Sequence, residues 1–109
     1  MANDSVRLSD EMASTLGLAA QAEHTRDDIG AAVRSRFGRS GTRPVDGLES
    51  LPVHVLGELV VLLDAGGCQD LDAAVHTALA GADGDATSAP VHAVGGAICG
   101  ELAERHFMP

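Results

Sequence analysis

Residues 3–9, Asn-Asp-Ser-Val-Arg-Leu-Ser, are the stretch on which the prediction of the fold depends. Val6 and Leu8 alternate with polar residues, and this period of two is typical of a short strand with one apolar face. The final serine precedes Asp10 and Glu11, and a serine followed by two carboxylates indicates the start of a helix. We therefore expect a short strand that leads directly into a helix.

Further helices are indicated by apolar residues at helical spacing. The first pattern breaks near His24, and Thr25 is expected to cap a second helix, with Asp28 three residues on in a variant of the capping box. A third helix is expected after Ser50 and should stop at Gly66. The supporting stripes are Met12, Leu16, Ala19 and Ala20; Ile29, Ala32, Val33 and Phe37; Leu56, Leu59, Val60 and Leu63; Leu71, Ala74, Val75, Ala78 and Leu79; and Val91, Val94, Ile98 and Leu102.

The predicted fold class is mostly α, in two parts. Residues 1–40 form a module of one short strand and two helices, residues 41–50 form a linker rich in helix breakers, and residues 51–109 form a small three-helix domain. The helix over 53–63 is apolar on most faces, which is typical of a position at the centre of a core or of a subunit interface.

The charge is divided unevenly along the chain. The formal net charge is −9, and all seven basic residues are arginine, so the chain has no lysine. Residues 1–43 hold six arginines and six acidic residues, whereas residues 44–109 hold one arginine and ten acidic residues. Only the first segment could approach a phosphate backbone without general repulsion. The lysine-free, acidic composition also favours a halophilic protein over a simple bias in codon usage.

The cysteines and the hydropathy predict a cytoplasmic protein. Cys68 and Cys99 follow no secretory leader, so we expect two unpaired, buried thiols in a reducing compartment. The most apolar run, 53–63, is much shorter than the roughly 20 residues that a membrane span requires.

No pattern of catalytic or metal-binding residues stands out. Cys68, His76, His92 and Cys99 could in principle converge on a tetrahedral ion, but none of their spacings is typical of a metal site. The acidic loop at Asp83 lacks the other ligand positions of a calcium loop. Because nucleophile and phosphate-binding motifs are also missing, we expect neither an enzyme nor a bound cofactor.

The order strand, helix, turn, helix within residues 3–37 resembles the ribbon-helix-helix family, which includes the Arc, MetJ and CopG repressors. The resemblance rests on Val6-Arg7-Leu8-Ser9 followed by Asp-Glu-Met, and on Thr25-Arg26-Asp27-Asp28-Ile29 at the start of the second helix. It covers about a third of the chain. The glycine often found between the family's two helices is replaced here by Glu23-His24.

A lone short strand has an unpaired edge and little core beneath it, so we expect it to pair with the strand of a second copy. The resemblance implies that this ribbon enters the major groove of double-stranded DNA, with Asn3, Ser5 and Arg7 contacting base edges. It also implies that Thr25 and Arg26 hold phosphate at the start of the second helix, although Asp27 and Asp28 in the same turn would oppose this.

The predicted function is a homodimeric, sequence-specific DNA-binding transcription regulator, for which repression is what the resemblance implies. Residues 51–109 would serve further association or bind another protein. Three alternatives remain open: an ordinary strand or a frayed terminus before a helical bundle; an antitoxin-type repressor whose tail binds a partner; and an all-helical adaptor that uses the helix over 53–63 as its contact surface. Arg34, Arg36, Arg39 and Arg43 either assist DNA binding or form a solvated helix end and linker.

Overall fold

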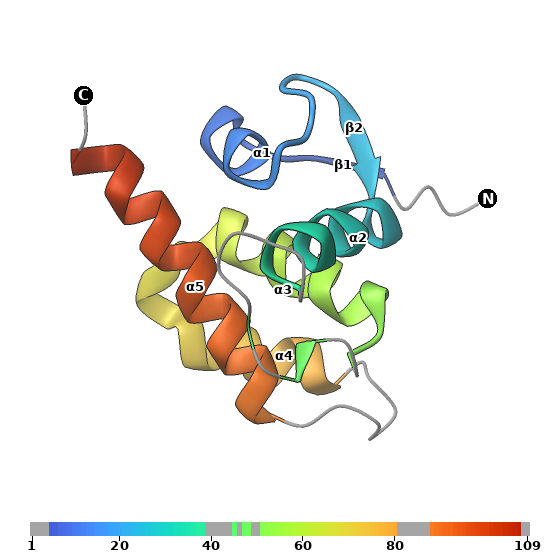
Figure 1. Ribbon diagram of the computed structural model, residues 1–109, viewed down its shortest axis with the longest axis vertical. Coiled ribbons are helices and arrows are strands. Elements are labelled where there is room, and N and C mark those ends of the chain that lie inside the picture. The colour runs from blue at the N-terminus through green and yellow to red at the C-terminus, as the bar shows by residue number, and fades with distance from the viewer. Residues whose placement is uncertain (1–4, 39–44, 46, 49–50, 81–87, 108–109) are drawn as a thin grey trace.

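The fold is described by a computed structural model that covers residues 5–38, 45, 47–48, 51–80 and 88–107 (Figure 1). It is mostly helical, with one small antiparallel sheet. The elements are β1 (Ser5–Arg7), α1 (Asp10–Leu16), β2 (Glu23–Thr25), α2 (Arg26–Phe37), α3 (Val53–Gly66), the short 3₁₀ helix η2 (Cys68–Asp70), α4 (Leu71–Ala80) and α5 (Ser88–Phe107).

The strand β1 finds its partner within the same chain. It pairs antiparallel with β2, so that Ser5 lies opposite Thr25, Val6 opposite His24 and Arg7 opposite Glu23. We expected one strand per chain, paired with the strand of a second copy. This expectation is wrong, because the partner strand belongs to the same chain. The segment that was predicted to be only a turn between two helices supplies the second strand.

Both predicted N-caps are confirmed. The Ser9 hydroxyl accepts a hydrogen bond from the Met12 amide at 3.2 Å, and the Thr25 hydroxyl accepts one from the Asp28 amide at 3.1 Å. Each bond satisfies an amide that the first turn of a helix leaves without a partner. The first helix ends earlier than the apolar pattern suggested, because Gly17 adopts a left-handed φ of 74° and terminates α1 after Leu16.

One hydrophobic core joins the two predicted parts of the chain. It contains buried side chains from α1 and α2, such as Met12 and Phe37, together with side chains from α3, α4 and α5. Leu48, which was placed in the linker, is also fully buried in this core. The helix α3 lies at its centre, packed against α2, α4 and α5, as its apolar sequence predicted.

The helices α2 and α3 touch backbone to backbone at two glycines. A Cβ atom on Gly57 would overlap the carbonyl group of Arg26, and a Cβ atom on Gly30 would overlap that of Val53. Because only glycine leaves room for such an approach, these two residues set the spacing of the two helices.

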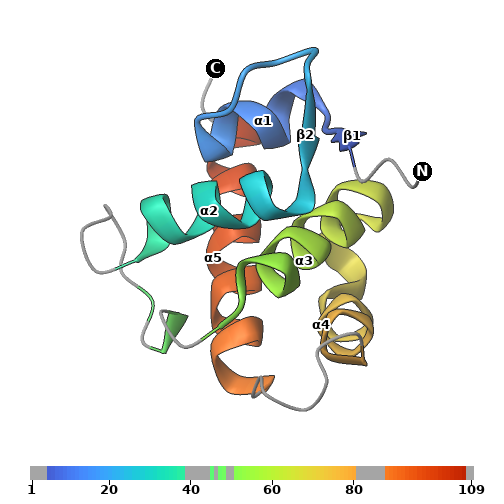
Figure 2. The same cartoon turned by 90° about the vertical axis from the view of Figure 1, so that its right-hand side faces the viewer.

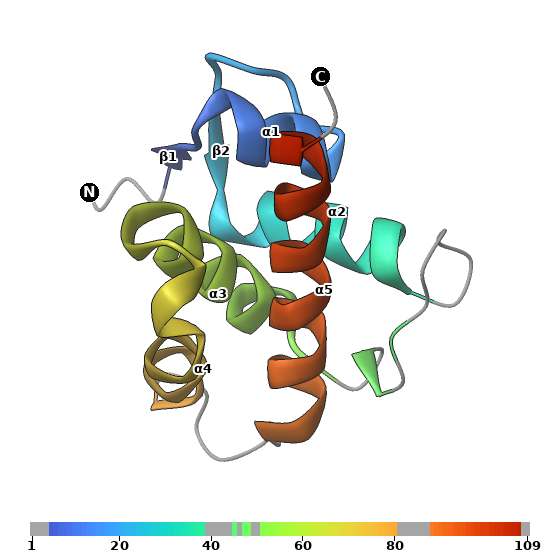
Figure 3. The same cartoon turned by 90° about the vertical axis from the view of Figure 1, so that its left-hand side faces the viewer.

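The helix α5 runs along the molecule from the α4 end to the α1 end (Figure 2, Figure 3). Its apolar residues Val91, Val94 and Ile98 are fully buried, which confirms the predicted stripe. Within the described residues, no helix combines the length and the apolar character needed to cross a membrane.

A disulfide bond links Cys68 at the start of η2 to Cys99 on α5. The expectation of two unpaired thiols is therefore wrong. No local pattern indicates this bond, because the cysteines are 31 residues apart and the packing of the helices α3, α4 and α5 brings them together.

Candidate nucleic-acid interface

The two-stranded sheet has an inner and an outer face. Val6 packs against the core, and the ring of His24, which lies opposite it, makes a 3.0 Å contact through Nε2 with the Ala19 carbonyl oxygen. Residues opposite each other in an antiparallel pair project from the same face, and successive residues alternate. Ser5, Arg7, Glu23 and Thr25 therefore share the outer face.

Arg7 is exposed on this outer face. Among the residues that the structure describes, its side chain makes no hydrogen bond or ion pair. Its neighbour across the sheet is Glu23, which is also exposed. The guanidinium group of Arg7 is thus available to a ligand, and the residue opposite Arg7, Glu23, carries a carboxylate.

The predicted phosphate contacts are occupied differently. The Thr25 hydroxyl caps α2, as described above, and so holds one of the amides that was expected to bind phosphate. Arg26 turns toward α3, where its Nε lies 2.5 Å from the Glu58 carboxylate. Both side chains of this pair are about one-third exposed. The structure therefore assigns Arg26 to the contact between α2 and α3.

The structure brings three of the five predicted contact residues to one surface. Ser5, Arg7 and Thr25 lie on the outer face of the sheet. Arg26 follows Thr25 in the chain, but its guanidinium group is held by Glu58. Asn3 lies outside the described residues, so its place on this surface stays a prediction.

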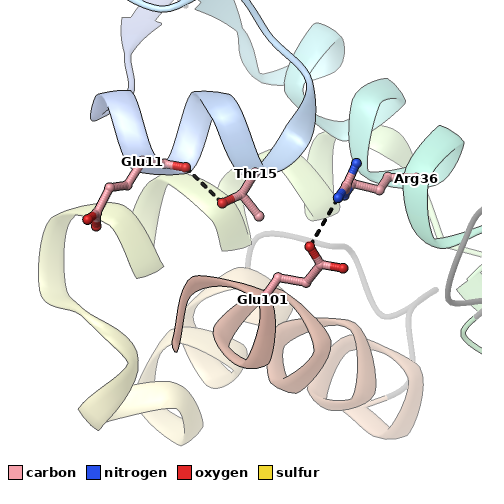
Figure 4. Close-up of polar contacts among 4 residues, drawn as sticks. All are labelled: Glu11, Thr15, Arg36 and Glu101. Carbon is pink, nitrogen blue, oxygen red and sulfur yellow. Dashed lines mark hydrogen bonds and ion pairs between the residues drawn. The ribbon is translucent and has the colours of Figure 1, made fainter. Parts of the chain in front are cut away.

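Two further arginines also bind within the chain. Arg34 on α2 donates from an Nη atom to the Leu51 carbonyl oxygen, and Arg36 pairs with Glu101 on α5 at 3.1 Å. Figure 4 shows Arg36 and Glu101 pointing toward each other from α2 and α5, while the Thr15 hydroxyl donates to the Glu11 carbonyl oxygen within α1. Neither Arg34 nor Arg36 forms the solvated helix end that the sequence suggested, and Arg39 and Arg43 lie outside the described residues.

The charge around the outer face is not strongly positive. Glu23 is exposed opposite Arg7, Asp27 and Asp28 are exposed in the first turn of α2, and Arg26 is paired with Glu58. Exposed carboxylates repel phosphate groups over the distance set by salt screening. This surface can offer a cation to a base edge, but it cannot attract DNA by charge alone.

Two hollows lie elsewhere. One, of about 460 Å³, lies between α1, the end of α3, η2 and α5 and includes Ser9, Asp64 and both cysteines. The other, of about 480 Å³, lies between α4 and α5, where His92 and Asp72 are 3.0 Å apart. In the described part of the chain, no group of three or more candidate ligands could hold a metal ion. Two of the four residues considered above form the disulfide.

Sequence reasoning missed Glu23 and Glu58, the two carboxylates that decide the surroundings of Arg7 and Arg26. Both act across elements that are far apart in the chain: Glu23 through the register of β2 with β1, and Glu58 through the crossing of α2 and α3. No local periodicity reports such contacts. The polar sequence Glu23-His24-Thr25 also lacks the alternation by which the first strand was found.

The chain was compared with known proteins, and no family model, curated protein or solved structure matches it.

Proposed function

We propose that this chain is a sequence-specific DNA-binding regulator that presents the outer face of the β1–β2 sheet to the major groove. The observation that carries the proposal is the contrast among the described arginine side chains. Arg26, Arg34 and Arg36 are each held by an acceptor within the chain, whereas Arg7 is exposed without one. On an acidic molecule, such an arginine is available to bind an electron-rich partner.

The shape of the sheet supports this use of Arg7. The major groove of B-DNA admits a two-stranded antiparallel ribbon, and residues on one face then meet base edges. Arginine makes a forked pair of hydrogen bonds to guanine, which is the commonest specific contact. Thr25 lies on the same face, and its hydroxyl, which accepts a hydrogen bond as the cap of α2, keeps a proton that it can donate to a neighbouring base.

The ribbon is complete in one chain, so dimerisation is not needed to form it. The proposal nevertheless retains a homodimer, because one edge of β1 and one edge of β2 are left unpaired by the described residues. An exposed strand edge is a template for pairing with a second copy. Two copies would read two half-sites of a repeated DNA sequence.

The acidic surroundings of Arg7 determine how binding should respond to salt. Each neutralised phosphate contributes a slope of about −0.9 to the dependence of log K on log salt concentration. With Arg26 engaged by Glu58, few phosphate contacts are available, and we expect a slope no steeper than about −2. At that slope, raising the salt concentration tenfold to about 1 M would weaken binding by about a hundredfold at most, which is less than a protein with many phosphate contacts would lose.

A helical adaptor remains the second candidate, favoured by the exposed acidic residues Glu23, Asp27 and Asp28, which suit a basic protein partner. The surface first expected for it is not free, because Leu56, Leu59 and Val60 of α3 are fully buried in the chain's own core. The proposal includes repression of transcription and a cytoplasmic location. Its variant is an antitoxin-type repressor, in which residues 51–109 bind a partner protein.

The experiment that tests the proposal is selection of duplex DNA from a random pool at several salt concentrations, with the wild type, Arg7→Ala and Arg7→Lys compared. We expect the wild type to enrich a short repeated sequence that contains guanine, and Arg7→Ala to enrich none. Arg7→Lys keeps the charge but loses the fork, so it should bind the selected duplex with reduced preference for guanine. Circular dichroism checks that all three fold alike.

The two candidates predict different results. If the wild type enriches no sequence at any salt concentration, the proposal of DNA binding is wrong and the adaptor is the better hypothesis. If Arg7→Ala enriches the same sequence as the wild type, the outer face of the sheet is not the reading surface.

A further inference from the structure

The disulfide between Cys68 and Cys99 lies beside a hollow of the surface. Both cysteines line the pocket of about 460 Å³, together with Ser9, Asp64 and Leu102. Each cysteine is only partly buried. A disulfide that lines an open pocket can be approached by the thiolate of another molecule, whereas one enclosed in the core cannot.

The disulfide helps to hold α4, whose other contacts with the rest of the molecule are weak. The buried residues of α4 are Ala74, Val75 and Ala78, and its leucines Leu71 and Leu79 are only partly buried against the core. Its polar contact with α5 joins Asp72 to His92, whose side chains are 94% and 54% exposed. Small or partly exposed side chains bury less apolar area than the fully buried leucines of α3, and an exposed polar contact contributes little, so packing alone holds α4 less firmly than α3.

The start of α4 is fixed to α5 at two adjacent points. The side chain of Leu71 occupies the space beside Gly95, where a Cβ atom would lie 2.7 Å from a Leu71 methyl group. One helical turn further along α5, Cys99 forms the disulfide with Cys68. When the disulfide is broken, the packing of Leu71 beside Gly95 is the apolar contact that still holds this end of α4 against α5.

Two glycines, Gly66 and Gly67, connect α3 to the segment that contains η2 and α4. The helix α3 ends at Gly66, and Gly67 has a positive φ of 78°. No heavy atom lies within 4 Å of where a Cβ atom would be on either residue. Glycine visits many backbone conformations without steric cost, so these residues can act as a hinge between α3 and the segment that follows.

We propose that the Cys68–Cys99 disulfide is a redox switch that controls the docking of residues 68–80, which form η2 and α4. A dithiol reductant supplies the two electrons: one of its thiolates attacks a sulfur of the disulfide, and its second thiol resolves the mixed disulfide. The products are two cysteine thiols and the oxidised, cyclic form of the reductant. Residues 68–80 then move away from α5 about Gly66 and Gly67, and oxidation restores the docked state.

The test is amide hydrogen exchange of the whole chain, with and without dithiothreitol in native buffer. We expect reduction to accelerate exchange in α4 by about tenfold or more, while exchange in α2 stays within about twofold. Mass spectrometry of the same samples reports the fraction of the disulfide that is reduced. Because α2 serves as an internal reference, a local change is distinguished from loss of the whole fold.

The double variant Cys68→Ser/Cys99→Ser provides the matched control. It should show fast exchange in α4 at all times and no response to dithiothreitol. The comparison of oxidised and reduced wild type does not depend on this variant, so the proposal stays testable if the variant fails to fold.

Three outcomes would overturn the proposal. Unchanged exchange in α4 after complete reduction would show that packing alone holds the helix. Equal acceleration in α2 and α4 would show that the bond supports the whole fold. Resistance of the disulfide to dithiothreitol until denaturant is added would show that the pocket gives no access to it. The switch does not depend on DNA binding, and each proposal can fail without the other.

Discussion

Gly30 and Gly57 decide how α2 and α3 meet. Each has its missing side chain replaced by a carbonyl group of the other helix, that of Val53 for Gly30 and that of Arg26 for Gly57. The carbonyl group of Arg26 is rigid backbone and cannot turn aside as a flexible side chain could. A substitution at Gly57 must therefore push the two helices apart.

We predict that Gly57→Ala destabilises the chain by about 2 kcal/mol through overpacking. Alanine is the better helix former by about 1 kcal/mol, so the direction of the effect is opposite to that expected from helix propensity. Urea unfolding followed by circular dichroism measures the change in the free energy of unfolding.

Gly96→Ala is the matched control for this prediction. Gly96 also lies within a helix, α5, but no heavy atom lies within 4 Å of where its Cβ atom would be. Here propensity should dominate, and we expect stabilisation of up to about 1 kcal/mol. If Gly57→Ala were as stabilising as Gly96→Ala, the close approach of α2 and α3 would be wrong.

The sequence predicted which residues of β1 lie on the outer face better than it predicted which groups bind the arginine side chains. The alternation of Ser5, Val6 and Arg7 placed Val6 against the core and Arg7 outside, which the structure confirms. The role of Arg26 could not be predicted, because its partner Glu58 is 32 residues away on another helix. Contacts of this kind depend on the crossing of two helices, and no local pattern reports it.

At the scale of elements, Ser9 and Thr25 cap α1 and α2 with the same kind of bond, and Ser9 also binds a residue of another helix. Besides accepting from the Met12 amide, Ser9 donates its hydroxyl to Asp64 at 2.6 Å, and its backbone amide donates to the same carboxylate at 3.0 Å. Asp64 lies near the end of α3. Ser9 thus caps its own helix and attaches it to α3.

We predict that Ser9→Ala costs more stability than Thr25→Ala. Loss of an N-cap costs about 1 kcal/mol, and loss of a hydrogen bond to a carboxylate adds about 1 kcal/mol or more. Thermal and urea unfolding of the two variants measure both costs under the same conditions.

The Asp64→Ala background separates the two contributions. In that background we expect Ser9→Ala to cost about as much as Thr25→Ala, because only the cap remains to be lost. An equal cost of Ser9→Ala with and without Asp64 would contradict the attachment of α1 to α3 by this pair.

The helices were largely predictable, whereas the second strand was not. Apolar stripes and the caps Ser9 and Thr25 indicated α1 and α2, and Gly66 marked the end of α3, as the structure shows. β2 has only polar residues, and it exists because β1 lies beside it. An element that depends on a distant partner leaves no periodicity of its own.

At the scale of the whole molecule, several polar contacts and one core join the first 38 residues to the rest. The ion pairs Arg26–Glu58 and Arg36–Glu101 link α2 to α3 and α5, and the Ser9–Asp64 pair links α1 to α3. The division at residues 41–50 therefore does not divide the core.

The β1–β2 sheet and the helix α4 lie in different regions of the molecule. In Figure 1 and Figure 2, β1 and β2 lie at one end and α4 lies at the other. The proposed DNA contact therefore lies away from α4, whereas the pocket beside the disulfide is also lined by Ser9 and Met12 near the start of α1.

The most direct test of the central claim is an NMR titration of the ¹⁵N-labelled chain with the duplex DNA obtained by selection. We predict that amide signals shift in β1, in β2 and in the first turn of α2, and that Arg7→Ala removes these shifts while leaving the free spectrum otherwise unchanged. Shifts confined to α4 and α5, or no shifts at a saturating DNA concentration, would contradict the assignment of the outer face of the sheet as the DNA-binding surface.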